Sequence, residues 1–246
     1  MKFTYAAYQK LLQDIVQAGY TVASYHTSDA IEMPCILRHD VDFDLDKALA
    51  FAQIEADAAK SMGIKIASTF FVLLNTAFYN VFSSSNRKRL AKILELGHEI
   101  GLHFGEAAFE AGEDSLKREI VNEIEILSRI IGQKVQTVSL HRPSPQLLEA
   151  DLAIPAAANA YSHTFIREYK YLSDSRMHWH EDVEAVVKSG QYKRLHILTH
   201  PFWYEESERA IESKLSAFIR DASSQRYHFL AENIRDFKGI LREEDI

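Results

Sequence analysis

Two carboxylates spaced i and i+2 close an apolar run of the sequence, Ile36-Leu37-Arg38-His39-Asp40-Val41-Asp42. In an extended strand, residues two apart project from the same face, so Asp40 and Asp42 would point into one space. Close like charges raise one pKa or require a cation, so such a strand end indicates a metal ion, a catalytic base or both. Surface acids at the start of a helix remain an equal alternative from these residues alone, because a helix-start pattern follows at residues 44–49.

Three histidines stand at the predicted ends of further strands: His103, His141 and His200. In parallel α/β folds, catalytic groups gather at the C-terminal ends of the strands, because the loops there open on one side of the sheet. Any one of these histidines is more often an ordinary core or surface residue, but three together are harder to explain in that way. A carboxylate and two imidazoles are a common ligand set for a catalytic Zn²⁺ or similar divalent ion, which leaves a position for water. A second carboxylate can then serve as base and a further histidine as acid.

The elements that must position these side chains are strands alternating with helices. Apolar runs and helical spacing predict strands at 34–42, 64–74, 99–104, 135–141 and 194–200, a less regular strand at 171–174, and helices at 5–18, 45–62, 86–96, 115–131, 181–188 and 205–223. This alternation predicts a parallel sheet with helices outside it, and no linker or change of composition divides the chain. We therefore expect one α/β domain over residues 1–246, a closed or nearly closed β/α barrel.

The composition of the chain excludes several classes of protein. Its 246 residues are 47% hydrophobic and 26% charged, with a net charge of −7, which argues against sequence-independent binding of nucleic acid. The lone Cys35 cannot form an internal disulfide. The sequence shows neither a secretory signal nor an apolar run long enough to span a membrane, so we expect a cytoplasmic protein.

Four motifs, taken in their order along the chain, resemble those of the polysaccharide deacetylase superfamily, also described as NodB-homology or carbohydrate esterase family 4. They are His39-Asp40-Val41-Asp42, Gly97-His98-Glu99-Ile100-Gly101-Leu102-His103, Leu140-His141-Arg142-Pro143 and Leu198-Thr199-His200-Pro201. The resemblance covers residues 34–204. It implies a distorted, often incomplete β/α barrel of about seven strands. It also implies removal of N- or O-acetyl groups from sugars with a divalent metal, usually zinc.

The resemblance assigns a role to each motif residue. It implies that Asp40 is the catalytic base, that Asp42 and His103 are metal ligands, that Arg142 orients the base, and that His200 protonates the leaving amine. His98 would be structural. The stretch from Tyr171 to Arg176 resembles a motif of the pocket wall. The substrate contacts expected from it and from nearby aromatic residues are Asp174, Arg176, Trp179 and Trp203.

One position departs from the pattern of the family. The second metal histidine is expected four residues after His103, where this chain has Ala107. Two replacements are available, His141 at the end of a neighbouring strand or Glu106 in the following loop. We favour His141 because an imidazole preserves the ligand type and a strand end fixes its direction. The predicted metal ligands are therefore Asp42, His103 and His141.

The sequence thus predicts a metal-dependent hydrolase that deacetylates an N-acetylated amino sugar or a precursor of a surface polysaccharide. Its substrate would be a small molecule or an oligosaccharide. Two alternatives stay open. One is hydrolysis of a different C–N bond, such as that of a cyclic amide or ureide. The other, suggested by Ala107, is a degenerate barrel that binds a glycan without catalysis.

Overall fold

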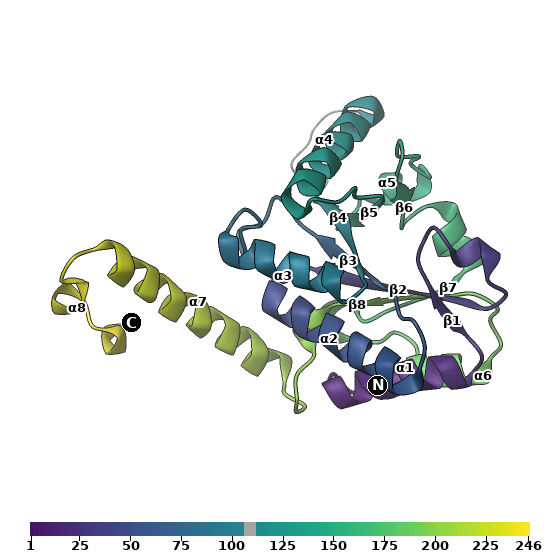
Figure 1. The fold of residues 1–246 in the computed structure, drawn as a ribbon, viewed down its shortest axis with the longest axis horizontal. Coiled ribbons are helices and arrows are strands. Elements are labelled where there is room, and N and C mark those ends of the chain that lie inside the picture. The colour runs from purple at the N-terminus through teal and green to yellow at the C-terminus, as the bar shows by residue number, and fades with distance from the viewer. Residues whose placement is uncertain (106–111) are drawn as a thin grey trace. The chain divides into compact units, whose positions relative to one another are not determined.

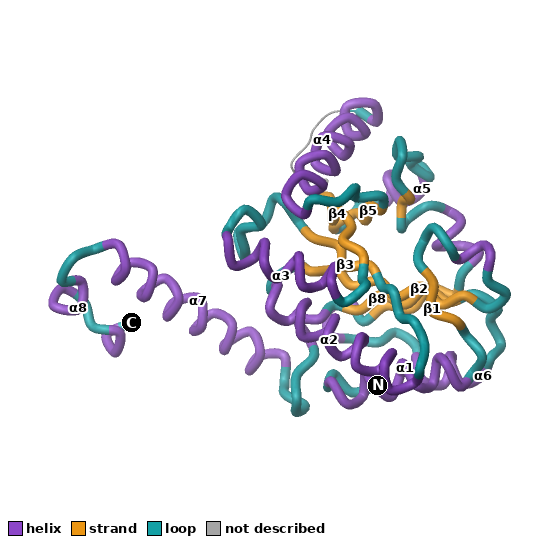
Figure 2. Tube along the Cα trace, viewed as in Figure 1, coloured by secondary structure: helices purple, strands orange, loops and turns teal. Residues whose placement is uncertain are grey.

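A computed structural model describes residues 1–105 and 112–246. The chain divides into two compact units, Met1–Glu206 and Ser207–Ile246, which are described separately below. In the first unit, one sheet lies among a set of helices (Figures 1 and 2). Its strands are β1 (Thr21–Ala23), β2 (Pro34–Val41), β3 (Thr69–Val72), β4 (Glu99–Gly105), β5 (Thr137–His141), β6 (Ala158–Asn159), β7 (Lys170–Ser173) and β8 (Leu195–Thr199).

The helices of this unit begin and end where local signals in the sequence place them. In α2 the Asp44 side chain accepts hydrogen bonds from the first free backbone N–H groups, and Gly63 ends the helix in the left-handed region at φ 66°. Neighbouring helices pack in the order α6, α1, α2, α3, α4. Their bounds are α1 (Tyr5–Gln17), α2 (Leu45–Met62), α3 (Ser84–Glu95), α4 (Glu113–Ile131), α5 (Pro145–Glu149) and α6 (Val183–Ser189).

The sheet is parallel and curled, with the strand order β6-β5-β4-β3-β2-β8-β7. Among the described strands no ladder joins β6 to β7, so the barrel is incomplete. The predicted fold class, a distorted or incomplete β/α barrel, is confirmed. The alternation of strands and helices predicted the parallel sheet with helices outside it, because parallel neighbours need crossover helices on the outer face. The incomplete closure was expected from the family resemblance.

The strand expected at 64–74 is shorter than predicted, because two strands, β1 and β3, pair with different parts of β2. β1 pairs with β2 at Pro34 to Ile36, and β3 pairs with β2 only from Arg38 onward. Residues 64–68 therefore cannot extend β3 along β2, because the backbone groups of β2 that they would pair with are already bonded to β1. The two-residue β6 was missed, since two residues cannot produce a periodic pattern.

Strand β2 is buried along its whole length and presents a different environment on each face. Ile36, Arg38 and Asp40 share one face by alternation. Ile36 there belongs to an apolar cluster with Phe71, Phe165 and others. His39 points to the opposite face, toward α2, where its ring Nε2 donates a hydrogen bond to Glu55 Oε1 at 2.9 Å.

Glu55 is a fully buried carboxylate that joins four separate segments. Besides His39 of β2, it accepts hydrogen bonds from the Tyr8 hydroxyl of α1 and the Ser68 hydroxyl before β3, and it lies 3.3 Å from His98 Nδ1, just before β4. Burial alone would raise the pKa of Glu55, but the neighbouring His39 and His98 lower it to about 2. The ionised form is therefore the one that the fold stabilises.

The second unit contains α7 (Ile211–Asn233) and the short α8 (Phe237–Ile240). Tyr227 of α7 packs on Phe237 at a ring distance of 5.2 Å. The final helix, expected at 205–223, thus begins and ends later than predicted. Within residues 1–105 and 112–246, none of the helices has the length and apolar composition needed to cross a bilayer. The expectation of a single domain over residues 1–246 stays a prediction.

The Glu55 cluster predicts a specific loss of stability in acid. Because the folded pKa of about 2 lies below the unfolded value of 4.5, ionised Glu55 stabilises the fold above pH 4.5. That contribution, on the order of 3 kcal/mol, is lost as the pH falls toward 2. Denaturant unfolding as a function of pH should show this slope in the wild type and a flatter one in Glu55→Gln. The exposed Glu95→Gln is the matched control. An equally flat profile in that variant would show that the pH dependence of stability does not come from Glu55.

Candidate metal and catalytic site

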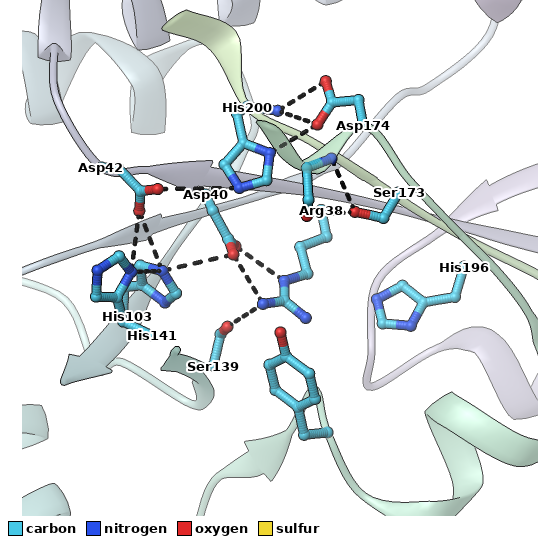
Figure 3. A network of polar contacts seen from close by, with 12 residues as sticks. Arg38, Asp40, Asp42, His103, Ser139, His141, Ser173, Asp174, His196 and His200 are labelled. Atoms are coloured by element: carbon cyan, nitrogen blue, oxygen red, sulfur yellow. Dashed lines mark hydrogen bonds and ion pairs between the residues drawn. The ribbon is translucent and has the colours of Figure 1, made fainter. Parts of the chain in front are cut away.

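The side chains predicted to bind metal or transfer protons lie close together at the C-terminal ends of β2, β4, β5 and β8 (Figure 3). Asp40 lies near the end of β2 and Asp42 directly follows that strand. His103 is in β4, His141 is the last residue of β5, and His200 directly follows β8. Strand alternation and the parallel register bring these side chains to one place, as the sequence led us to expect.

Asp42, His103 and His141 form a compact cluster of potential ligands. Asp42 Oδ1 lies 3.3 Å from His103 Nε2 and 3.3 Å from His141 Nδ1, and the two imidazole nitrogens are 3.1 Å apart. The ligands of a tetrahedral ion with bonds of about 2.1 Å are separated by about 3.4 Å. The three atoms therefore have the spacing that a Zn²⁺-sized ion requires, and they are the group that the structure offers for a metal within its described residues.

The hydrogen bonding of the cluster also suits a cation. Asp42 Oδ1 is buried and makes no hydrogen bond within the described part of the chain, although both imidazoles lie within ion-pair distance. Burial alone would raise the pKa of Asp42, but His103 and His141 hold it far below its ordinary value. A carboxylate kept ionised, with one buried oxygen lacking a hydrogen bond, fits a metal ligand.

Asp40 is paired with an arginine that the sequence analysis did not single out. Arg38 donates from Nε to Asp40 Oδ1 and from Nη2 to Oδ2, both at 2.8 Å, and both side chains are buried. Burial alone would raise the pKa of Asp40, but the Arg38 guanidinium lowers it below its ordinary value. Asp40 is thus ionised, and its Oδ2 lies 3.5 Å from His103 Nε2.

The expected role of Arg142 requires a correction. Arg142 is exposed and adopts a left-handed backbone at φ 50°, whereas Arg38 contacts both oxygens of Asp40. Strand alternation would place Arg142 on the side of the chain opposite to His141. The signal that could have identified Arg38 is its position two residues before Asp40, which places both side chains on one face of β2.

His200 is held by a second buried pair. Its Nδ1 lies 2.6 Å from Asp174 Oδ1, and Asp174 also accepts hydrogen bonds from the His200 backbone N–H at 3.0 Å and from the Tyr204 hydroxyl at 3.0 Å. Burial alone would lower the pKa of His200, but Asp174 raises it to about 9. The imidazolium is therefore the stable form at neutral pH, and its Nε2 lies 3.9 Å from Asp42 Oδ2 (Figure 3).

The four predicted substrate contacts differ in how far their side chains are exposed. Asp174 is fully buried and engaged with His200, so its expected contact with substrate is corrected to a contact with the imidazole. Trp203 is 7% exposed and packs on Phe202 and Phe43, which leaves little of it for a ligand. Arg176 is exposed with φ 59°, and Trp179 is half-buried.

Two further residues bear on the prediction. Glu106 and Ala107 lie outside the described residues, so the alternative ligand Glu106 has no described position. Phe78, which sequence reasoning missed, is 54% exposed although its ring packs on Phe43 at 4.9 Å, beside Asp42 in the chain. An exposed aromatic ring in a loop gave no periodic signal by which it could have been found.

No protein-family model matches this sequence, and no curated protein matches it. Several solved structures resemble the chain. A polysaccharide deacetylase from Bacillus cereus, BC0361, is 8% identical over 87% of this chain and 61% of its own, with a TM-score of 0.45. The Streptococcus pyogenes deacetylase PplD, solved with acetate, is 11% identical over 80% of this chain and 83% of its own, with a TM-score of 0.42.

A third similar structure is BA3943 from Bacillus anthracis, described as a CE4 family pseudoenzyme, which is 11% identical over 79% of this chain and 62% of its own, with a TM-score of 0.42. Two of these three structures are described as deacetylases and the third as a CE4 family pseudoenzyme. With TM-scores below 0.5, this likeness does not identify the reacting groups. The chemistry of the site rests on the distances given above.

Removal of a ligand provides a direct test of the cluster. His103→Ala and His141→Ala should each weaken Zn²⁺ binding by more than about 100-fold, beyond the effect typical of residues outside the ligand shell. Chelator competition with elemental analysis would measure this. The exposed His26→Ala is the matched control and should bind Zn²⁺ like the wild type. Stoichiometric, tight Zn²⁺ in both site variants would show that the ion is held elsewhere.

Proposed function

We propose that this chain is a metal-dependent hydrolase that removes the acetyl group from an N-acetylated amino sugar or a precursor of a surface polysaccharide. One observation carries the proposal. An Asp-His-His cluster, a carboxylate paired with arginine and an imidazole paired with aspartate converge at one end of the sheet. Metal-dependent amide hydrolysis uses these parts: a Lewis acid, a base for the attacking water and an acid for the leaving amine.

The metal would be held by Asp42, His103 and His141, and zinc fits this nitrogen and oxygen ligand set. A divalent ion there would polarise the acyl carbonyl and make the attacking water more acidic. The chain's own groups supply the proton transfers. Asp40 lies beside the cluster, with Oδ2 at 3.5 Å from His103 Nε2, and it is ionised, so it can accept a proton from water.

His200 completes the reaction from the other side of Asp42. Its raised pKa keeps a proton on Nε2, the nitrogen not bonded to Asp174, and that nitrogen faces the cluster at 3.9 Å from Asp42 Oδ2. As the C–N bond breaks, His200 donates this proton to the amine nitrogen. Water has then supplied oxygen to the acyl carbon and a proton to Asp40, and the products are acetate and a free amine.

The sugar as substrate is supported by the ordered motifs and by aromatic surface near the cluster. Phe43 directly follows Asp42, and the exposed ring of Phe78 packs against it. Aromatic rings of this kind stack on the apolar faces of pyranose rings. Half-buried Trp179 and exposed Arg176 remain proposed contacts for the rest of the substrate.

The base can be tested separately from the metal. Asp40→Asn keeps the shape of the side chain but removes its ability to take a proton, so release of acetate from N-acetylglucosamine oligomers should fall by about 100-fold or more. Bound Zn²⁺ should stay at the wild-type level. The exposed Asp57→Asn is the matched control and should retain full activity. Loss of the metal in Asp40→Asn would identify Asp40 as a ligand, and activity on cyclic amides alone would identify a different substrate class.

The acid can be tested through its pH dependence. Because Asp174 raises the pKa of His200 to about 9, kcat/KM should fall as the pH rises through about 9 and His200 loses its proton. In Asp174→Asn, the largest contribution opposing burial is lost and the charges of Asp40 and Asp42 alone still raise the pKa of His200, so this alkaline limb should move toward neutrality. Tyr204→Phe removes one hydrogen bond but keeps the Asp174 charge, and it should shift the limb less. An unchanged limb in Asp174→Asn would show that His200 is not the titrating acid.

A further inference from the structure

We infer that Arg38 determines which of the two carboxylates, Asp40 or Asp42, binds the metal: by binding both oxygens of Asp40 it keeps that side chain off the metal and leaves Asp42 as the carboxylate ligand. This inference deepens the proposed function and rests on it. It makes Arg38 a positioning residue, since Arg38 would act through Asp40 and would not contact the substrate.

The distances show why the two carboxylates need to be distinguished. Asp42 Oδ1 lies 3.3 Å from His103 Nε2, and Asp40 Oδ2 lies 3.5 Å from the same nitrogen. Proximity to His103 therefore does not decide which carboxylate binds an ion, although Asp42 Oδ1 also lies 3.3 Å from His141 Nδ1. If both carboxylates bound the ion, its coordination sphere would be full and no carboxylate would be left to accept a proton from water.

The two carboxylates differ in their hydrogen bonds. Each oxygen of Asp40 accepts from Arg38 at 2.8 Å, whereas Asp42 Oδ1 accepts no hydrogen bond among the described residues. A two-point guanidinium contact fixes the plane of a carboxylate as well as its position, and it competes with a cation for the same lone pairs. Asp40 is thus turned toward Arg38, and Asp42 is left available to the metal.

Arg38 is itself held firmly enough to act in this way. It is fully buried, and its Nη2 also donates to the Ser139 hydroxyl of β5. Its guanidinium carbon lies 4.5 Å from the ring centre of Tyr161 and 5.5 Å from that of Phe71. Contacts from three other segments therefore keep the guanidinium in place. A movement of Asp40 toward an ion would break its hydrogen bonds to Arg38.

The test compares metal binding in Arg38→Met, Asp40→Asn and the double variant. If Arg38 keeps Asp40 off the ion, Arg38→Met frees a second carboxylate, and Zn²⁺ should bind about tenfold more tightly or better. The absorption spectrum of the Co²⁺-loaded protein should change as the coordination changes. At the same time kcat for acetate release should fall while KM stays close to the wild type.

The double variant Arg38→Met/Asp40→Asn separates this explanation from simple removal of a positive charge. Without the Asp40 carboxylate, the Zn²⁺ affinity and Co²⁺ spectrum should return close to those of Asp40→Asn. If the double variant bound Zn²⁺ as tightly as Arg38→Met, the charge of Arg38 alone would explain the gain and the inference would be wrong. The double variant also leaves no unpaired buried carboxylate, which protects its folding.

Arg38→Lys is the second route should Arg38→Met not fold. Lysine keeps the charge but lacks the planar fork, so Asp40 should again be released, with tighter Zn²⁺ and an altered Co²⁺ spectrum. Unchanged affinity and spectrum in a folded Arg38 variant would overturn the inference and leave the proposed function standing. Wild-type protein that binds metal but releases no acetate would overturn the proposed function alone, and wild-type protein that binds no metal would overturn both.

Discussion

The alternation of side chains along β2 is the constraint on which the rest of the site depends. It places Arg38, Asp40 and Asp42 on one face at the end of a strand that is buried along its length. Three charges of this kind cannot stay there unpaired, because a buried charge without a partner costs several kcal/mol. Arg38 binds Asp40, and Asp42 faces the imidazoles of β4 and β5. Strands β4 and β5, which lie beyond β3 from β2, thus carry histidine at the end of the sheet where β2 is followed by Asp42.

The opposite face of β2 determines how firmly this arrangement is held. His39 contacts Glu55 of α2 through one ring nitrogen and the Thr199 hydroxyl of β8 through the other, at 2.7 Å. Thr199 immediately precedes His200. The network that anchors α2 therefore also fixes β8 against β2, and with it the distance between the imidazole of His200 and the carboxylates. A fully satisfied buried network of this type favours a single arrangement over several similar ones.

Much of this could be predicted from the sequence, for reasons that particular residues make clear. The strand ends carrying Asp42, His103 and His141 were predictable because parallel strands bring their C-terminal ends together. The partner of Asp40 was predicted wrongly. Arg142 was chosen because it stands in a family motif, although the alternation of side chains along β2 indicates Arg38. Asp174 was taken for a substrate contact because residues 171–176 resemble a motif of the pocket wall, and such a resemblance does not reveal burial. Only the packing of Tyr204 and His200 around it shows that it faces inward.

The two buried pairs also explain how two proton-transfer groups can share one site. A cation beside Asp40 stabilises the ionised carboxylate, and an anion beside His200 stabilises the imidazolium, so the pKa of the first is lowered and that of the second raised to about 9. Environments that push two pKa values apart are what separates a base from an acid at a single pH. Exchanging the partners would reverse both effects and leave a protonated carboxyl beside a neutral imidazole. The working protonation states are therefore set by Arg38 and Asp174, which lie behind the reacting groups, and they hold across the whole interval between the two pKa values.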